Sequence, residues 1–377
     1  MIEKENNSVT PPIMTDGNAA LAPRSGPSED FWAAKLRARP DYLACKSLQD
    51  LYAEAFVSPP PVIENLLMRG VYLLAGPPKI GKSFLVAQLA YHVSLGLPIW
   101  GYPVRQGTVL YLALEDDEER LQKRMFLMYG PHDTDELYFA QTAGGLEDSL
   151  IPQLTSFLRN HPRTNLIVID TFQKIRGTDG AKYSYADDYT AIVQLKNFAD
   201  TNGICVVAVH HTRKQSADDP FDLISGTTGL LGAADGAMIL RKKDRTSSEA
   251  TLEVTGRDQP DQKLYLQKDP ASQIWQLSQA AVEIRSAPPD PVLDAVAKFV
   301  GDNGGRWTGT ATELVQSTAV DLAPNAMGKL LNVRASELYN IHHIRYTTRA
   351  RHNGREISLV SEPVETEETA EQSGPEP

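Results

Sequence analysis

The sequence of 377 residues contains only two cysteines, Cys45 and Cys205. Two cysteines cannot build the disulfide framework that stabilises many small secreted domains. Cys205 also lies inside an apolar run that is typical of a buried strand. Free thiols in a reducing compartment are therefore the simpler interpretation, and we expect a cytoplasmic protein.

Long apolar runs are also missing, because nothing approaches the roughly 18 consecutive apolar residues of a membrane span. Residues 1–28 are polar and lack the apolar core of a signal peptide. We therefore expect no membrane partner. The net charge of −11 argues against a protein coated in nucleic acid, but it leaves room for a local basic surface.

The pattern of apolar runs predicts an α/β fold. Five runs alternate with helical patterns or follow them, as in a parallel sheet covered on both faces: Val71–Ala75, Thr108–Leu114, Leu166–Ile169, Ile204–Val209 and Ala237–Leu240. Three shorter alternating segments predict an antiparallel extension of that sheet: Thr251–Val254, Lys263–Gln267 and Ile274–Leu277.

Composition divides the chain into five parts. Residues 1–42 are expected to be a disordered tail, because they cannot bury enough apolar surface to offset the entropy of ordering. Residues 43–280 form the α/β domain, 281–290 a linker that overlaps the proline-rich segment Ser286–Pro291, and 291–360 a small domain. Residues 361–377 carry six Glu and no Lys or Arg, which is typical of a disordered acidic tail.

The strongest motif runs from Gly76 to Ser83 and fits the phosphate-binding pattern G-x-x-x-x-G-K-[ST]. An apolar strand leads into it, and an amphipathic helix starting with Phe84 leaves it. The predicted nucleotide-binding residues are Gly76, Pro77, Pro78, Lys79, Ile80, Gly81, Lys82, Ser83 and Phe84. Lys82 would reach the β- and γ-phosphates of ATP, and the Ser83 hydroxyl would ligate Mg²⁺.

Two further strands end in acidic residues, as a Mg²⁺–nucleotide site requires. Asp170 follows Leu166–Ile169 and is the predicted Mg²⁺ ligand, with Thr171 beside it. Glu115 follows the strand before it and is the predicted general base for the attacking water. The next acids, 116–119, are better explained as residues that open a helix and interact favourably with its dipole.

Together these motifs resemble those of the RecA-like ATPases, and in particular the plasmid RepA-type hexameric replicative helicases and their mobile-element relatives. The resemblance covers roughly residues 66–277. It implies that His211, where the strand of the motif Val209–Lys214 ends, senses the γ-phosphate. It also implies that Arg257 reaches the nucleotide of a neighbouring subunit in a ring, although a surface pair between Arg257 and Asp258 is nearly as good an interpretation.

The resemblance further implies two channel loops that grip single-stranded DNA. The stretch 176–189 contains Lys182, Tyr183 and Tyr185, and the stretch 213–223 contains Arg213, Lys214 and Phe221. Cations beside aromatic rings suit a single strand. Both stretches also contain a pair of aspartates, so a solvated loop without a nucleic-acid partner is an equal alternative.

The small domain is predicted to be a winged helix. Thr310 and Glu313 form a capping box that opens a helix, and His352-Asn353-Gly354 predicts a hairpin. Residues 307–314 resemble the winged-helix tails of phage and mobile-element primase and helicase proteins. Arg345, Arg349, Arg351 and Arg355 lie on the hairpin, with no acid over residues 341–355. We expect this wing to bind duplex DNA, while docking to a protein is the alternative.

The leading hypothesis is an ATP-hydrolysing helicase that forms a hexameric ring and acts in the replication of a plasmid or another mobile element. A second hypothesis is a DNA-binding regulator that ATP switches without unwinding. A third is an assembly factor whose winged helix binds protein.

Overall fold

The computed structural model describes residues 43, 45–176, 185–212, 221, 224, 228–242, 244, 246–280, 290–351 and 354–362. The predicted tail over residues 1–42, nearly all of the linker and nearly all of the acidic tail lie outside these residues. The chain divides into two compact units, residues 1–53 and 54–377. In the first unit the described part contains a short helix, α2 (Leu48–Ala53), which buries no residue.

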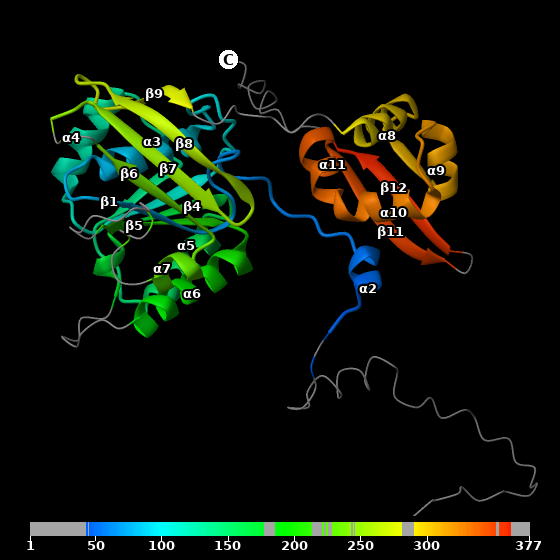
Figure 1. Ribbon diagram of the computed structural model, residues 1–377, viewed down its shortest axis with the longest axis horizontal. Coiled ribbons are helices and arrows are strands. Elements are labelled where there is room, and N and C mark those ends of the chain that lie inside the picture. Colours follow the sequence, from blue (N-terminus) through cyan, green and yellow to red (C-terminus); the bar gives the residue numbers. More distant parts are fainter. Residues whose placement is uncertain are drawn as a thin grey trace, which may run out of the picture. The chain divides into compact units, whose positions relative to one another are not determined.

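The second unit contains a nine-stranded sheet that fulfils the α/β prediction (Figure 1). Its order is β3-β2-β4-β5-β1-β6-β7-β8-β9. All pairs from β3 to β6 are parallel. These strands are β1 (Gly70–Gly76), β2 (Thr108–Ala113), β3 (Leu137–Ala140), β4 (Thr164–Asp170), β5 (Cys205–His211) and β6 (Gly236–Arg241).

Helices connect the parallel strands, as the alternation of apolar runs and helical patterns predicts. They are α3 (Lys82–Leu95), α4 (Glu118–Tyr129), α5 (Leu150–Asn160), the short 3-10 helix η1 (Phe172–Lys174), α6 (Tyr185–Asn202) and α7 (Thr228–Ala233). One apolar core lies between α3 and the sheet, and a second lies on the opposite face among α5, α6 and α7. The helix α3 is apolar around most of its circumference and is buried on nearly all sides, so it differs from the amphipathic helix that we expected after the loop.

The antiparallel extension consists of β7 (Glu249–Gly256), β8 (Gln259–Lys268) and β9 (Trp275–Ala280). Its strands alternate buried and exposed residues, and the buried set joins the core around α3. The extension therefore confirms the period-2 prediction, and with the parallel strands it gives the predicted α/β architecture, a parallel sheet flanked by helices and continued by antiparallel strands.

One strand was not predicted. β3 has only four residues, and none of them is fully buried because the strand lies at the edge of the sheet. A short edge strand leaves neither a long apolar run nor a clear alternation, so its sequence differs little from that of a loop.

The C-terminal part has a core of its own, built by four helices and a three-stranded antiparallel sheet ordered β10-β12-β11. Its elements are α8 (Pro291–Asp302), β10 (Arg306–Thr310), α9 (Ala311–Thr318), α10 (Pro324–Val333), α11 (Ala335–His342), β11 (Ile344–Arg351) and β12 (Gly354–Ser361). The predicted capping box is present, since Thr310 and Glu313 bond reciprocally. Arg334 separates α10 from α11.

Candidate active site

The loop between β1 and α3 has the backbone that its glycines permit. Gly81 has a φ of 108°, a conformation that favours glycine, and α3 begins directly after it. A Cβ atom on Gly81 would also lie 2.9 Å from the Trp275 ring, and one on Gly76 would lie 2.6 Å from the Leu240 carbonyl. Side chains at these two positions would therefore distort the loop, which leaves its backbone open to a close approach by a ligand.

Lys82 lies at the centre of this loop and is only 5% exposed. Its ammonium group donates to the carbonyl oxygens of Gly76 and Pro77 at 2.8 and 2.9 Å. Burial lowers the pKa of Lys82 to about 8, although the nearby Asp170 and Glu115 carboxylates raise it. The amine is thus held inside the loop, largely protonated at neutral pH, by acceptors that a phosphate group could replace.

Asp170 ends β4 and is almost fully buried beside the loop. Tyr111 on β2 donates its hydroxyl to Asp170 Oδ2 at 2.9 Å. Burial raises the pKa of Asp170, whereas hydrogen bonds from Ser83 and Tyr111 lower it. The structure therefore brings together Ser83 and Asp170, the two predicted metal ligands, and adds Tyr111, which the sequence did not single out.

Glu115 lies in the turn after β2, one residue further from the strand than expected, because β2 ends at Ala113. The Thr171 hydroxyl donates to Glu115 Oε1 at 3.1 Å. The neighbouring Leu114 N–H donates to the Asp170 carbonyl at 2.8 Å, which ties this turn to the end of β4. Thr171 thus contacts the predicted base, whereas we expected it to support the metal ligand.

The acids after Glu115 have structural partners. Asp116 pairs with Arg124 of α4 at 2.7 Å. Asp117 is the N-cap of α4 and accepts from the Arg120 N–H, and the next two glutamates lie in the first turn. These positions confirm the prediction that the acids after Glu115 open a helix.

The two histidines at the end of β5 have different surroundings. His210 is buried and its ring meets Phe172 edge to face, on the face of the sheet away from the loop. His211 Nδ1 lies 3.2 Å from the Lys82 ammonium nitrogen. Burial and the Lys82 charge lower the pKa of His211, so its ring is neutral at pH 7 and can accept from Lys82. Of the two histidines, only His211 lies beside the P-loop, as predicted.

Lys82, Ser83, Glu115, Asp170 and His211 therefore surround one glycine loop at the carboxyl ends of four parallel strands. Residues 40–217, which include all five, match the family model described as an AAA domain. The chain contains a P-loop ATPase domain. No protein of curated function matches the sequence.

Two solved structures are similar to the chain. One is described as "ATPase Domain of G40P"; it is 15% identical, with a TM-score of 0.47, and the match covers 55% of this chain and 84% of that one. The other is described as "The Structure Of A DnaB-Like Replicative Helicase And Its Interactions With Primase". It is 14% identical, with a TM-score of 0.48, over 66% of this chain and 70% of that one.

Arg257 of the ATPase domain lies at the amino edge of the sheet, where the parallel strands begin. The P-loop lies at the carboxyl edge, where these strands end. Arg257 follows β7, whose last residue pairs with Gly236 at the start of β6, and Gly236 in turn pairs with Tyr72. Four residues of β1 separate Tyr72 from Gly76, which corresponds to about 13 Å of strand. Arg257 therefore does not join the loop of its own chain.

The partner of Arg257 is not Asp258, contrary to the surface pair that we considered. Its guanidinium group donates to the Gly232 carbonyl at 3.1 Å and lies 3.9 Å from Asp235 Oδ1. Asp235 also accepts from the Val71 N–H and pairs with Lys196. The side chain of Arg257 is about half exposed, so its guanidinium group contacts its own chain on one side and solvent on the other.

Sequence motifs missed Trp275, which attaches the antiparallel extension to the P-loop. Its ring nitrogen donates to the Gly81 carbonyl at 3.3 Å. Its backbone N–H and carbonyl form two hydrogen bonds of 2.9 Å with the Gln88 side chain on α3. Almost two hundred residues separate the partners, so no local pattern could have revealed these contacts.

The predicted channel loops lie mostly outside the described residues, including Lys182, Tyr183, Arg213 and Lys214, and the side chain of Tyr185 is not described. Arg176, at the start of the first stretch, is buried in an ion pair with Asp188 of α6 and lies over the Phe172 ring. One aspartate of that stretch is thus explained by a structural role.

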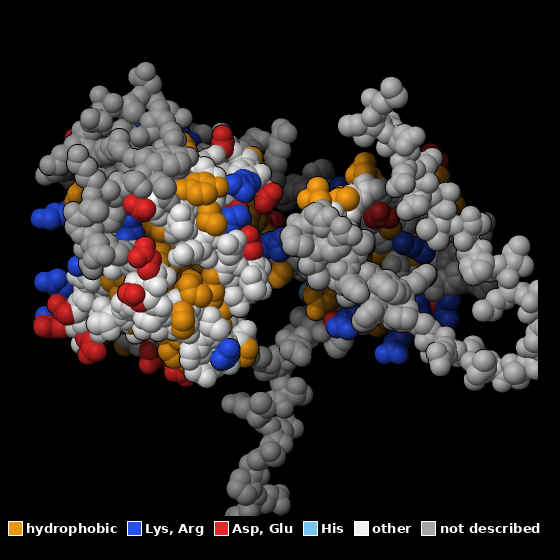
Figure 2. Space-filling model, turned by 90° about the horizontal axis from the view of Figure 1, so that it is seen from below, with side chains coloured by type: hydrophobic (Ala, Val, Ile, Leu, Met, Phe, Trp, Pro, Cys, Tyr) orange, Lys and Arg blue, Asp and Glu red, His pale blue; other side chains and the backbone are white. Residues whose placement is uncertain are grey.

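The C-terminal hairpin carries its predicted arginines, but acids from outside the predicted acid-free stretch approach two of them. Arg351 pairs with Glu356 at 2.7 Å, and Arg345 pairs with Glu362 at 2.5 Å. In the view of Figure 2, Lys and Arg side chains stand out on the C-terminal part, whereas acidic side chains are more frequent on the ATPase domain. The hairpin thus sets four arginines against two glutamates, and its positive charge is smaller than the arginines alone suggest.

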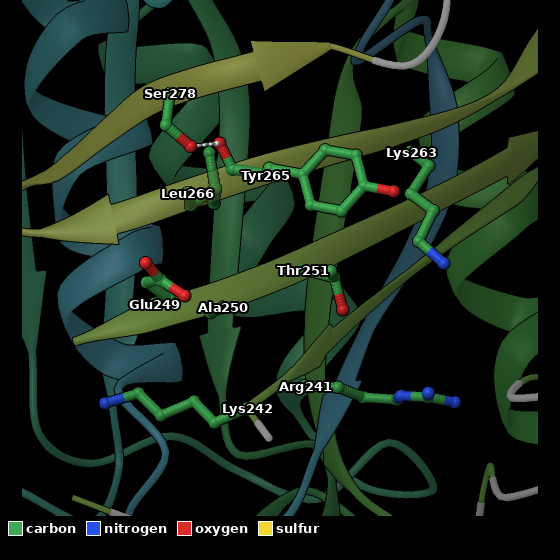
Figure 3. A pocket seen from close by; sticks show the side chains of 9 residues that line it. All are labelled: Arg241, Lys242, Glu249, Ala250, Thr251, Lys263, Tyr265, Leu266 and Ser278. Atoms are coloured by element: carbon green, nitrogen blue, oxygen red, sulfur yellow. Dashed lines mark hydrogen bonds between the residues drawn. The ribbon is translucent and has the colours of Figure 1, made fainter. Parts of the chain in front are cut away.

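A separate hollow of about 520 Å³ lies on the antiparallel extension. Arg241, Lys242 and Lys263 line it together with Glu249 and Tyr265, and their side chains point in different directions (Figure 3). Lys263 is neutralised in part by Glu253 at 3.5 Å. These charged groups do not converge on one point, as they would around a bound anion.

Among the described residues, no helix is long and apolar enough to cross a membrane. Within the same part of the chain, no cluster of three or more His, Cys, Asp or Glu could hold a metal ion by itself.

Proposed function

We propose that the chain is an ATP-driven motor that moves on or opens DNA, and that it works as a ring of identical subunits. The observation that carries the proposal is the convergence of Lys82, Asp170 and Glu115 on one glycine loop. The resemblance of these motifs to plasmid RepA-type helicases favours a hexamer and the DNA of a mobile element.

The loop residues bind the triphosphate of ATP. Backbone N–H groups of residues 79–84 and the positive end of α3 surround the phosphates. Lys82 exchanges the carbonyls of Gly76 and Pro77 for the β- and γ-phosphates, and its proton is retained because the phosphates are stronger acceptors. His211 follows the amine and thereby responds to an occupied γ-phosphate position.

Ser83 and Asp170 fit a Mg²⁺ ion that accompanies ATP. Both provide oxygen ligands beside the loop, and two protein groups suffice because Mg²⁺ takes its remaining ligands from water and substrate phosphates. The burial that raises the pKa of Asp170 leaves its carboxylate in need of a positive partner. When bound, the ion would neutralise charge that develops on the phosphates.

Glu115 activates the attacking water. Its carboxylate lies in the turn beside the loop, and the Thr171 hydroxyl fixes one oxygen, which leaves the other to accept a proton. Asp116 is a weaker candidate because Arg124 already neutralises it.

Arg257 supports the ring. It lies far from the P-loop of its own chain and its guanidinium group is half exposed, so it is accessible to a nucleotide that a neighbouring chain binds. There an arginine would stabilise charge on the transferring phosphoryl group.

DNA binding rests on two features of different strength. The channel loops are proposed from sequence, with cations and aromatic residues that suit a single strand. The C-terminal part has the element order of a winged helix, whose hairpin arginines suit duplex phosphates. The pairs of Arg351 and Arg345 with glutamates favour the alternative of protein docking more than the sequence alone did.

The test is an ATPase measurement on the full chain with and without single-stranded DNA, joined to strand displacement on a forked duplex. We expect DNA to accelerate hydrolysis and the fork to open, with Lys82→Ala as an inactive control. Hydrolysis without displacement, at a rate that DNA does not change, would leave an ATP-switched regulator. Failure to bind any DNA at low salt would favour the protein-docking factor.

A further inference from the structure

Lys268, the last residue of β8, lies against two aromatic rings next to the P-loop. Its ammonium nitrogen is 4.0 Å from the centre of the Phe84 ring and 5.7 Å from that of Trp275. It donates to Gln273 Oε1 at 2.7 Å. Phe84 is the residue directly after the predicted Mg²⁺ ligand Ser83, so this amine belongs to the surroundings of the nucleotide.

Two further cations approach the same rings. Lys242 lies after β6 with its amine 5.4 Å from the Trp275 ring, and the Arg124 guanidinium is 5.3 Å from the Phe84 ring. Arg124 is paired with Asp116, but among the described residues neither lysine has a carboxylate within 4 Å. Burial, Lys242 and Arg124 lower the pKa of Lys268 to about 8. The cluster thus holds positive charge that the protein itself leaves unneutralised.

The position of the Lys268 amine beside the P-loop indicates which part of the nucleotide it contacts. A Cβ atom on Gly81 would lie 3.6 Å from the Lys268 amine, so the amine borders the loop backbone itself. In the sheet, β2 and β4 with Glu115 and Asp170 lie on one side of β1, and β8 and β9 lie on the other. The acids mark the γ-phosphate side of the loop. In a loop of this type the backbone N–H groups surround the α- and β-phosphates, so an amine beside the Gly81 backbone and away from the acids is expected near those phosphates.

We propose that Lys268 is a phosphate-binding residue that contacts the nucleotide near its α-phosphate, with Lys242 adding charge beside it. The antiparallel extension then completes the nucleotide site in the same chain, and Trp275 holds it there through its bond to the Gly81 carbonyl. This inference rests on the ATP site of the proposed function and not on DNA binding or ring formation. Its alternative is a cation that only fastens β8 to α3 through the Phe84 ring.

The experiment measures binding of ADP and of a non-hydrolysable ATP analogue to the full chain by calorimetry. The variants are Lys268→Met, which keeps the length and apolar stem without the charge, and Lys268→Arg, which keeps the charge. Lys263→Met is the matched control, because Lys263 lies on the same strand, is 42% exposed and pairs with Glu253. The melting temperature of each variant without nucleotide reports on a fastening role.

We expect Lys268→Met to weaken the binding of both nucleotides about tenfold, as for the loss of one charge-assisted hydrogen bond. The affinities of Lys268→Arg and Lys263→Met should be close to that of the wild type. Lys242→Met should weaken the binding of ADP and of the ATP analogue by a smaller factor, and this variant serves as the test if Lys268→Met does not fold. A fall in melting temperature with unchanged affinities would overturn the proposal in favour of fastening, and a loss confined to the ATP analogue would overturn the α-phosphate assignment.

Lys82→Ala, measured in parallel, separates this proposal from the ATP site on which it rests. If Lys82→Ala loses the ATP analogue while Lys268→Met binds it normally, only the inference about Lys268 is wrong. If the wild-type chain binds neither nucleotide, the proposed function fails as well.

Discussion

The amino and carboxyl edges of the sheet, where the parallel strands begin and end, carry functional residues in different ways. At the carboxyl edge of the parallel strands, four strand ends deliver Lys82, Glu115, Asp170 and His211 to one loop, and these side chains contact one another or a shared neighbour. At the amino edge of the same strands, Arg257 contacts Asp235 and the Gly232 carbonyl. One chain therefore brings together the groups for binding the phosphates, whereas a role in catalysis for Arg257 requires a second chain.

The largest expected effect tests Arg257 at the amino edge, whose role in catalysis requires a second chain. Arg257→Ala should keep nucleotide binding, because the P-loop is unchanged, and lose about 10³-fold or more in turnover. Asp258→Ala is the matched control, since Asp258 is not the partner of Arg257 and its loss should leave the rate near wild type.

Mixing Arg257→Ala chains with Lys82→Ala chains sharpens the same test, because some interfaces then combine an intact loop with an intact arginine. Turnover should partly return in proportion to the mixed interfaces. Normal turnover by Arg257→Ala alone, or a mixture that assembles yet stays inactive, would show that the site is not shared.

The next effect concerns the carboxyl edge, where one chain supplies all the groups around the P-loop. Glu115→Gln should bind ATP and slow its hydrolysis by about 10²-fold or more, because the amide cannot take a proton from water. Asp116→Asn serves as the control, since Asp116 already pairs with Arg124 and its loss should cost stability more than rate. Single-turnover hydrolysis measures both. The reverse ranking of the two variants would transfer the role of base to Asp116.

The smallest effect is a pH dependence of ATP binding at the same edge. Lys82 has a pKa of about 8 in the free protein, surrounded by His211, Asp170 and Glu115. Bound phosphates should raise that pKa, so affinity should be constant below pH 8 and fall above it, by up to about tenfold per pH unit for each such lysine.

Titrations of ATP affinity between pH 7 and 9.5 measure this slope. In Lys268→Met the remaining slope should report Lys82 alone, because both lysines have a pKa of about 8. An affinity that does not change across this range would mean that neither amine loses its proton in the free protein, and the burial that lowers both pKa values would then be smaller than the structure indicates.

Local patterns were sufficient where the physical cause is local. The P-loop needs glycine at Gly81 because of its φ of 108°, and this requirement is visible in the sequence as a fixed spacing. The strand ends that lead to Asp170 and toward Glu115 are visible because buried parallel strands are continuous apolar runs. The capping box at Thr310 is likewise a contact over three residues.

Other assignments failed or were missing because they depend on distant partners. Thr171 was expected near the metal ligand but donates to Glu115, since the turn after β2 is tied to β4. Asp235, and not Asp258, is the partner of Arg257, because pairing of β6 with β7 brings them together.

The sequence by itself determined the α/β fold class, the phosphate loop and the strand ends that carry its acids, because each of these follows from a run or spacing of a few residues. Only the tertiary structure decided which side chains share a site. Trp275 and Lys268 reach the P-loop because β8 and β9 curl onto α3, where burial of the Trp275 ring and two bonds to Gln88 fix them. Contacts over almost two hundred residues depend on how the sheet is ordered and curved, and no local pattern records that order.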